Sequence, residues 1–337
     1  MNKPRVEAEQ YIDYLVASPR TVSATEAARV QPASAQPIAH DAYTRLLHRL
    51  EPDPATLWQE AASQVERTTG LLVLDDSTLD KPYAQPGHMG LLTRHWSGKH
   101  RAVVQGINLL TLLWTDGARL VPVDYRLYDK AQDGLSKNDH FRQVLHTAQE
   151  RGFSPACVVF DSWYSSLENL KCLRELGWNW LTQLKKNRLV NPLGTGPVAL
   201  STCALEAAGT QVHLSGYGLI RVFRLVVPHG TTEEIEYWAT SDLTLSAEQR
   251  QEWARQAWGI ETYHRGIKQF CGVERAQVRA AKAQRNHIGC ALRAFLRLEY
   301  QRWTTGRSWW ESKHELLRNA IRTYLAAPTY RLPTPTA

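Results

Sequence analysis

The order of apolar and helical segments predicts a mixed α/β fold. Three apolar runs rich in β-forming side chains, residues 71–74, 103–114 and 120–127, are each bounded by turn-prone or charged residues, which is typical of strands. A helical pattern at 139–151, a short apolar run at 156–160, a helix from about 165 to 176 and a strand at 178–184 follow. Helices that alternate with strands in this way predict a mixed sheet flanked by helices.

The two ends of the chain and one internal segment have a different character. Residues 1–68 predict a small helical domain, with a capping-box pattern from Ser23 to Glu26 and a cap at Asp53 before Pro54. Residues 189–241 contain two alternating segments among Gly, Pro and Thr, which predicts a β-rich insertion. Residues 246–324 are helical again, the last helix begins at a capping box from Ser308 to Glu311, and 328–337 predict a disordered tail.

Composition and charge exclude several classes of protein. The chain has 337 residues, 43% of them hydrophobic, and its apolar runs are too short to span a membrane, so we expect a folded cytosolic protein. The five cysteines lie far apart without zinc-type spacing, which argues against a disulfide framework or a zinc finger. Lys and Arg number 40 against 33 Asp and Glu, and the net charge of +7 favours a polyanionic partner.

Three acidic residues stand at the ends of predicted elements. Asp76 ends the strand that starts at 71, and Asp161 directly follows the strand at 156–160. Glu261 lies in a predicted helix, with Arg265 and Lys268 on the same helix face at i+4 and i+7. Taken singly, each has an ordinary interpretation as a helix cap or a solvated ion pair.

The combination of the two aspartates changes this interpretation. Their strands can be neighbours in one sheet, which would bring both carboxylates to a shared point at the carboxyl end of the strands. Two carboxylates at one point repel each other unless a cation lies between them, and oxygen ligands in an incomplete cage favour magnesium.

At these residues the sequence resembles the DDE transposases of bacterial insertion sequences, in particular the cut-and-paste group. The resemblance extends from about residue 71 to 300 and rests on several motifs in the right order. They are Asp75-Asp76-Ser77-Thr78, Phe160-Asp161-Ser162-Trp163-Tyr164, Leu184-Lys185-Lys186-Asn187-Arg188 and the segment from Ile260 to Lys268. Asp76 matches the first family aspartate, Asp161 the second and Glu261 the glutamate. Family members also carry a Tyr and an Arg upstream of this glutamate, where Ala254 and Ala257 stand here.

The resemblance implies a domain organisation. We expect an RNase H-like catalytic core over 69–188 and 242–303, interrupted by the β-rich insertion at 189–241. The helical N-terminal domain, 1–68, is expected to contact DNA ends, and residues 304–337 are expected to form a C-terminal helix with a disordered tail.

The resemblance also implies a mechanism and partners. Asp76, Asp161 and Glu261 are expected to hold two magnesium ions, replaceable by manganese, with Asp76 bridging both. The substrates would be double-stranded DNA, namely the terminal inverted repeats of a transposon and its target. We expect a homodimer assembled on two DNA ends at the bacterial nucleoid.

Several residues are candidates for DNA contacts. Basic or polar groups can grip phosphates, and an aromatic near the end of the insertion can stack on an extruded base. The candidates are Lys185, Lys186, Asn187, Arg188, Trp238, His264, Arg265, Lys268, Arg279, Lys282 and Arg285, the last three placed along one helix.

Two other interpretations stay open at this point. The chain could be a catalytically silent DNA-binding protein derived from a transposase, which a DNA-nicking assay would detect. A phosphatase of the haloacid-dehalogenase type requires Asp-x-Asp after the strand, whereas Asp75 and Asp76 are adjacent here.

Overall fold

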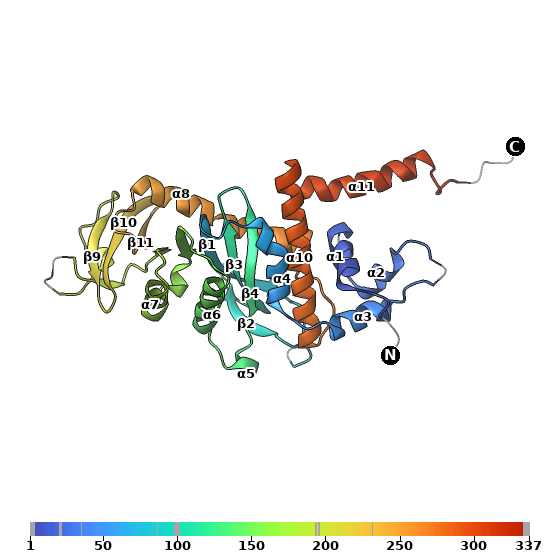
Figure 1. The fold of residues 1–337 in the computed structure, drawn as a ribbon, viewed down its shortest axis with the longest axis horizontal. Helices are drawn as coiled ribbons and strands as arrows, with labels where there is room; N and C mark the ends of the chain where they lie inside the picture. Colours follow the sequence, from blue (N-terminus) through green and yellow to red (C-terminus); the bar gives the residue numbers. More distant parts are fainter. Residues whose placement is uncertain are drawn as a thin grey trace. The chain divides into compact units, whose positions relative to one another are not determined.

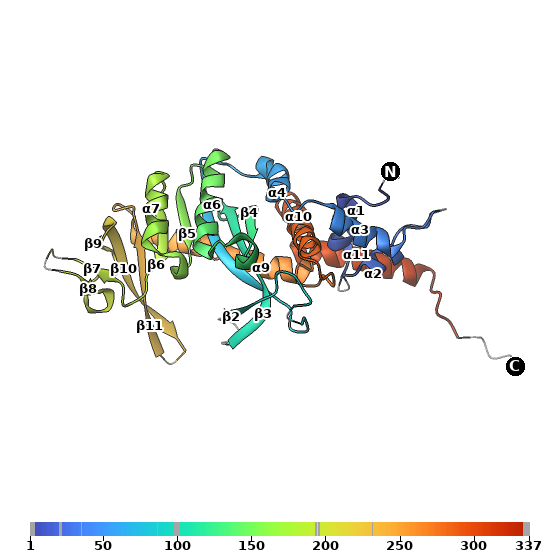
Figure 2. The same cartoon turned by 90° about the horizontal axis from the view of Figure 1, so that it is seen from below.

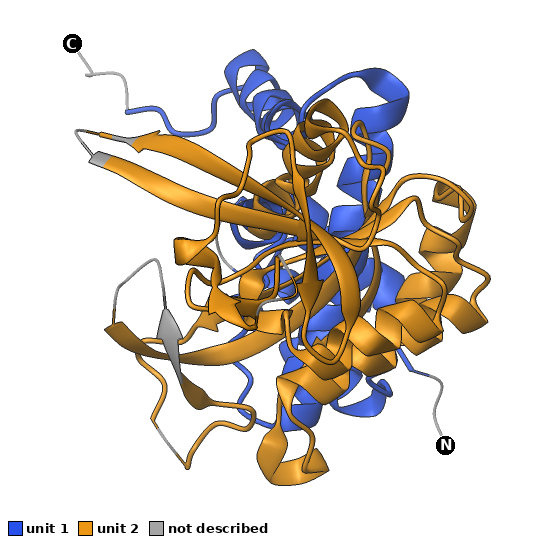
Figure 3. Cartoon of the chain, turned by 90° about the vertical axis from the view of Figure 1, so that its left-hand side faces the viewer, with its two compact units in different colours: residues 1–52, 265–337 blue, residues 53–264 orange. Residues whose placement is uncertain are grey.

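The computed structural model describes residues 4–19, 22–34, 36–85, 87–97, 102–192, 194, 196–230 and 232–332. The chain forms two compact units (Figure 3). We call residues 53–264 the sheet unit and residues 1–52 with 265–337 the helical unit. In the described part of the chain, no helix is long and apolar enough to cross a membrane.

The sheet unit is built on a nine-stranded mixed sheet with the order β2-β3-β1-β5-β6-β11-β10-β9, and β4 pairs with β3 (Figure 1). Its strands are β1 (Leu71–Asp80), β2 (Thr93–Ser97), β3 (Ala102–Thr115), β4 (Leu120–Leu127), β5 (Cys157–Phe160), β6 (Trp180–Gln183), β9 (Thr210–Leu214), β10 (Gly218–His229) and β11 (Thr232–Thr240). A separate two-stranded sheet pairs β7 (Leu189–Val190) with β8 (Val198–Ala199).

Helical segments of the sheet unit connect and cover these strands. They are α4 (Pro54–Ala61), η1 (Ala62–Gln64), α5 (Lys130–Asp133), α6 (Lys137–Glu150), η2 (Ser162–Tyr164), α7 (Leu167–Glu175), η3 (Leu200–Thr202), α8 (Ala247–Ala257) and the start of α9 (Gly259–Phe270). Figure 2 shows α6 and α7 next to each other along the sheet, and α8 contacts β1 and β5.

Strand β1 occupies the position from which the candidate site is built. It runs antiparallel to β3 and parallel to β5, and the parallel register ends with Leu74 opposite Phe160. All four residues of the apolar run 71–74 are buried, as expected for a central strand covered on both faces. Asp75 and Asp161 are the next residues after this pair, so the two acids lie at the same level of the sheet.

Helix α6 is fixed to the sheet by its sequence. Ser136 and Asp139 form a capping box at its start, and its buried face presents Phe141 to the sheet. The Phe141 ring lies 5.1 Å from the ring of Phe160 and 5.3 Å from that of Tyr164, measured between centroids. This packing holds the first turn of α6 next to the carboxyl ends of β1 and β5.

The β-rich insertion predicted from the sequence extends the main sheet. Strands β9, β10 and β11 form an antiparallel meander, and β11 pairs with β6 from Trp238 opposite Gln183 to Thr240 opposite Leu181. The insertion therefore brings Trp238 next to β6, opposite Gln183.

The helical unit consists of helices packed around α10. They are α1 (Ala8–Ala17), α2 (Ala24–Arg29), α3 (His40–Arg49), the end of α9, α10 (Ala281–Thr305) and α11 (Trp309–Ala326). Tyr11 hydrogen-bonds to Nδ1 of His287 at 2.9 Å, and the Asn286 side chain donates to the carbonyl of Leu47 at 2.7 Å. The capping box predicted at Ser308 is present.

This division differs from the expected boundary at residue 68. Helix α4 packs against β4 and belongs to the sheet unit, whereas α1 and α3 pack against α10. The physical reason is burial: the apolar face of each short helix needs a partner, and the partner of α1 and α3 comes from the far end of the sequence. The part of the predicted disordered tail from 333 to 337 lies outside the described residues.

Candidate active site

Asp75 and Asp76 end the buried part of β1 and point to opposite faces of the sheet, because side chains alternate along a strand. Asp76 faces the first turn of α6, where Nζ of Lys137 lies 2.8 Å from its Oδ2. Asp75 faces α9, where its Oδ2 lies 3.9 Å from Nδ1 of His264. The two neighbouring carboxyl groups therefore have different surroundings.

The carboxylate of Asp76 is held by three donors. Lys137 donates to Oδ2, the hydroxyl of Tyr164 donates to Oδ1 at 2.7 Å, and the side-chain amide of Asn108 also donates to Oδ2. Burial alone would raise the pKa of Asp76, but the Lys137 charge and these hydrogen bonds outweigh it and lower that pKa below its ordinary value. Asp76 is thus held in its ionised form.

Asp75 lies among other acids. Burial and the nearby charges of Asp76, Glu261 and Asp161 raise its pKa well above the ordinary value, although a backbone hydrogen bond opposes the shift. Its ligand atoms lie within 4.8 Å of those of Glu261 and His264. The raised pKa of Asp75 indicates a local excess of negative charge around its carboxyl group, which a bound cation would relieve.

Asp161 follows β5 and caps the short helix η2. Its Oδ1 accepts a hydrogen bond from the backbone N–H of Trp163 at 2.6 Å, so the ordinary interpretation as an N-cap is correct. The side chain is nevertheless exposed and lines a pocket of about 210 Å³. A capping role and a role in this pocket are compatible because a carboxylate has two oxygens.

Glu261 lies in the first turn of α9, the helix that the sequence predicted. Its exposed side chain lines the same pocket as Asp75 and Asp161, with Trp238 from β11 and Trp258 beside them. Of the expected triad, the structure brings Asp161 and Glu261 into one pocket, and Asp75 rather than Asp76 completes the lining. Asp76 remains within electrostatic range of Asp75 but on the other face of the strand.

We call Asp75, Asp76, Asp161 and Glu261 the acidic cluster. The carboxylate oxygens of Asp75 and Glu261, with the imidazole of His264, form a donor set that suits a divalent ion such as magnesium or manganese, and Asp161 lines the same pocket as the two acids. The side chains of Asp75 and Asp76 are only partly exposed, while Asp161 and Glu261 are exposed, so the cluster is open to solvent and to a substrate. The residues present therefore fit a metal site.

Two groups of this site were not chosen from the sequence. Asp75 is adjacent to Asp76, the aspartate chosen from the sequence. The two differ in the face of the sheet towards which their side chains point. The sequence contains one weak indication that Lys137 has an acidic partner. The helix dipole disfavours a lysine in the first turn of a helix, so a nearby acid is expected to offset its charge. The small Ala254 and Ala257, which replace the Tyr and Arg expected in the family, line the pocket and leave it open.

The basic turn after β6 borders a second pocket. Lys185, Asn187 and Arg188 line a cavity of about 390 Å³ together with Ser165, four residues after Asp161. Lys186 is exposed on the same turn. Burial lowers the pKa of the half-buried Arg188. The turn therefore presents cations close to the end of β5 in the sheet unit.

The remaining basic candidates belong to the helical unit. Arg265 and Lys268 lie on α9, and Nζ of Lys268 is 3.1 Å from the carboxylate of Glu274. Lys282 lies in the first turn of α10 and pairs with Glu51, and the half-buried Arg285 follows one turn later. The expectation that Arg279 belongs to the same helix is wrong, because α10 begins at Ala281 and Arg279 is exposed in the preceding segment.

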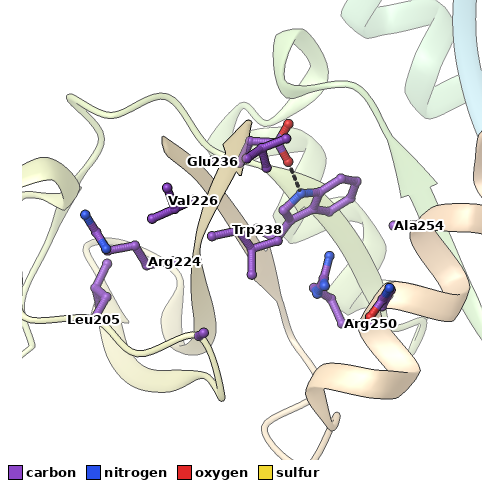
Figure 4. Close-up of a pocket in the computed structure, with 11 residues that line it drawn as sticks. Leu205, Arg224, Val226, Glu236, Trp238, Arg250 and Ala254 are labelled. Atoms are coloured by element: carbon purple, nitrogen blue, oxygen red, sulfur yellow. Dashed lines mark hydrogen bonds between the residues drawn. The ribbon is translucent and has the colours of Figure 1, made fainter. Parts of the chain in front are cut away.

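Trp238 lines the pocket of the acidic cluster and also a larger pocket of about 650 Å³, which Figure 4 shows. Its indole N–H donates to Glu236 at 2.8 Å. The guanidinium of Arg250, from α8, lies 5.9 Å from the Trp238 ring centroid and equally far from that of Phe223. Burial lowers the pKa of Arg250, and the charge of Glu236 opposes this. Arg224 completes the polar lining, so an aromatic surface with charged groups at its edge faces this pocket.

Comparisons with known proteins agree with this geometry. A family model described as the transposase DDE domain matches residues 68–296. The solved piggyBac transposase synaptic complex with hairpin DNA is similar at a TM-score of 0.51 and 13% identity, over 100% of this chain and 77% of that one. This likeness confirms the predicted RNase H-like fold with its mixed sheet.

Further matches are to the Mos1 strand transfer complex and the Drosophila P element transposase strand transfer complex. Their TM-scores are 0.20 and 0.27 at 12% and 7% identity, over 53% and 99% of this chain and 59% and 90% of theirs. No curated protein matches the sequence. The family model covers well over half of the chain and contains all four acids, and the chain therefore belongs to the family of transposases with a DDE domain.

Proposed function

We propose that this transposase cleaves transposon ends and joins them to target DNA by metal-dependent phosphoryl transfer at the acidic cluster. The observation that carries the proposal is the grouping of four acids from β1, the end of β5 and α9 at the carboxyl end of two parallel strands. This is the edge of an α/β sheet at which ligands usually bind.

Asp76, Asp161 and Glu261 are the proposed metal ligands, and Asp75 contributes a fourth negative charge. Bound divalent ions would activate a water or a DNA 3′-hydroxyl and stabilise the leaving oxygen at phosphorus. Tyr164 and Asn108 hold the Asp76 carboxylate in a fixed orientation, and the backbone of Trp163 does the same for Asp161. The chain thus positions its acids before any substrate binds.

Double-stranded DNA is the proposed partner, gripped through its phosphates. Lys185, Lys186, Asn187 and Arg188 would supply contacts beside the acidic cluster. His264, Arg265, Lys268, Arg279, Lys282 and Arg285 would extend them. Such contacts are independent of base sequence and weaken with salt. The slope of DNA affinity against salt concentration, on logarithmic scales, therefore gives the number of phosphate contacts.

The functional assay uses the purified chain, supercoiled DNA that carries the terminal repeats found beside its gene, and magnesium. We expect nicking at the repeat ends followed by joined products, and neither in EDTA, because each step needs the metal-bound acids. Glu261→Gln, which keeps size and removes charge, is the matched inactive variant. A chain that bound these ends but cut nothing in magnesium or manganese would be a silent DNA-binding protein, contrary to the proposal.

Trp238 is the proposed stacking surface for a base extruded from the duplex. Its side chain lines both the large pocket and the pocket of the acidic cluster. Base–aromatic stacking is worth about 1–3 kcal/mol, enough to offset part of the cost of unpairing.

Trp238→Ala should therefore slow cleavage of fully paired ends by about tenfold or more, while Trp238→Phe keeps most of the rate. A mismatch at the end should restore the alanine variant, because an unpaired base is easier to extrude. Cleavage rates on matched and mismatched duplexes measure this. An alanine variant that cuts paired ends at the normal rate would rule out the stacking role.

Cutting and joining require two DNA ends to be held together, so we propose a homodimer assembled on DNA. The size of the complex on one and on two end-containing duplexes, measured by light scattering, tests this. Action on such DNA would place the protein on the nucleoid of a bacterial cell, as the sequence resemblance implies.

A further inference from the structure

The large pocket of about 650 Å³ beside Trp238 is also lined by a buried cation, the guanidinium of Arg250 from α8. Only 8% of Arg250 is exposed, and its Nε has no hydrogen-bond partner among the residues that the structure describes. The carboxylate of the nearby Glu236 accepts from the indole N–H of Trp238. A buried charge without a hydrogen-bonded partner destabilises a fold, and a ligand in the pocket would supply the missing partner.

Arg250 lies where it can reach a ligand that stacks on Trp238. Phe223 of β10 is opposite Trp238 of β11 in the sheet, so the two rings lie on the same face. The guanidinium is 5.9 Å from each ring centroid, and Figure 4 shows it beside the indole. An anionic group attached to the stacked ring of a ligand would therefore lie next to Arg250.

The lining of the pocket favours a ligand with a flat ring and a negative charge. Arg224 and Arg250 outnumber Glu236 among its charged residues, and Leu225 adds apolar surface. The indole of Trp238 offers a flat surface for stacking, and a guanidinium binds the oxygens of a phosphate through paired N–H donors. A nucleotide combines these two features.

The large pocket adjoins the pocket of the acidic cluster. Trp238 and Ala254 line both of them, and Ala257 lines the second. Arg250, Ala254 and Ala257 follow one another in α8 at i, i+4 and i+7, so they lie on one helix face. A DNA strand bound at the acidic cluster can therefore continue past two small side chains towards Arg250.

We propose that the large pocket binds one nucleotide of the DNA strand held at the acidic cluster, with its base on Trp238 and its phosphate on Arg250. The contact does not depend on the identity of the base, because every base has a flat face and every nucleotide has a phosphate. Glu236 is a positioning residue, since it holds the indole that receives the base. The inference rests on the proposed stacking role of Trp238 and adds the phosphate contact that keeps the extruded nucleotide in place.

Binding of thymidine 5′-phosphate and of thymidine to the full chain in EDTA tests the phosphate contact, because it needs neither a metal nor a transposon end. Ligand-observed nuclear magnetic resonance gives the two dissociation constants. The unmodified chain should prefer the phosphate form by about tenfold or more, the scale of a hydrogen bond to a charged group. Arg250→Met, which keeps the length of the side chain and removes its charge, should lose this preference.

Two further variants serve as comparisons. Arg255→Met removes an exposed arginine of the same helix, which pairs with Glu252 at 2.6 Å, and should keep the preference. Trp238→Ala should weaken the binding of both ligands, because stacking does not depend on the phosphate. An undiminished preference in Arg250→Met would overturn the phosphate contact, and unchanged binding of both ligands in Trp238→Ala would overturn the stacking on which it rests.

Thermal unfolding separates a ligand contact from a structural role of Arg250. For a buried cation that is kept for a ligand, Arg250→Met should unfold at the same temperature as the unmodified chain or higher. Thymidine 5′-phosphate should raise the unfolding temperature of the unmodified chain by more than that of Arg250→Met. A lower unfolding temperature with an unchanged preference for the phosphate form would show that Arg250 only packs against the rings. If Arg250→Met does not fold, Arg250→Gln takes its place in all measurements.

Transposon-end duplexes in which single phosphates are replaced by neutral methylphosphonates extend the test to the proposed substrate. One replacement should weaken binding to the unmodified chain by about tenfold, and the same replacement should have no effect on Arg250→Met. A chain that cuts these ends but shows no such position would refute the Arg250 contact alone. A chain that binds thymidine 5′-phosphate through Arg250 but cuts no DNA would retain the pocket and refute the proposed function.

Discussion

Asp161→Asn should reduce DNA cleavage by roughly three orders of magnitude or more, the scale seen when one member of a catalytic unit is removed. Asparagine keeps the size of the side chain and an oxygen that accepts from the backbone of Trp163, so η2 stays capped. It removes only the negative charge that a divalent ion requires. DNA affinity should be unchanged or higher, because a charge that repels phosphate has gone.

Asp53→Asn is the matched control for this substitution. Asp53 caps α4 in the same way, since its Oδ1 accepts from the backbone N–H of Ala55 at 2.8 Å, but it does not line the pocket of the acidic cluster. Nicking rates at saturating protein and DNA affinity by fluorescence anisotropy should be normal in this variant. If Asp161→Asn nicked DNA in magnesium as fast as the unmodified chain, Asp161 would not be a metal ligand.

Asp76→Asn and Asp75→Asn form the second pair with a large expected difference. Asp76 matches the first aspartate of the family, and Lys137, Asn108 and Tyr164 hold its carboxylate ionised and in a fixed orientation. Cleavage by Asp76→Asn should therefore be lost at any magnesium concentration, again by roughly three orders of magnitude. Asp75→Asn should bind metal more weakly, since one of four negative charges is gone, and should recover cleavage at saturating magnesium.

Cleavage rates over a magnesium titration distinguish the two aspartates. The reverse pattern, with Asp75→Asn inactive and Asp76→Asn rescued, would assign the ligand role to Asp75. That result is the natural alternative, because Asp75 is the aspartate that shares a pocket with Asp161 and Glu261.

The sequence by itself determined the order of the elements and the residues at their ends. Apolar runs with period two or without polar interruption predicted β1, β3, β4, β5 and β6, and helical periodicity predicted α6 to α11. These signals are local, because each depends on side chains a few residues apart. The sequence also placed Asp161 directly after β5 and Glu261 on its helix, as the structure has them, whereas the expectation that Asp76 ends its strand is wrong, because β1 continues to Asp80 by pairing with β3. The family model contains all three acids.

Only the tertiary structure decided which way the acids point and what lies beside them. The pleat of β1 turns Asp75 and Asp76 to opposite faces, and a shift of one residue would exchange their roles. Lys137 reaches Asp76 across 61 residues of sequence, and Tyr11 meets His287 across 276, so neither contact leaves a local signal. The same holds for β11, which joins the sheet by pairing with β6. Partners distant in the sequence are selected by burial and charge in the folded chain, and local periodicity does not contain that information.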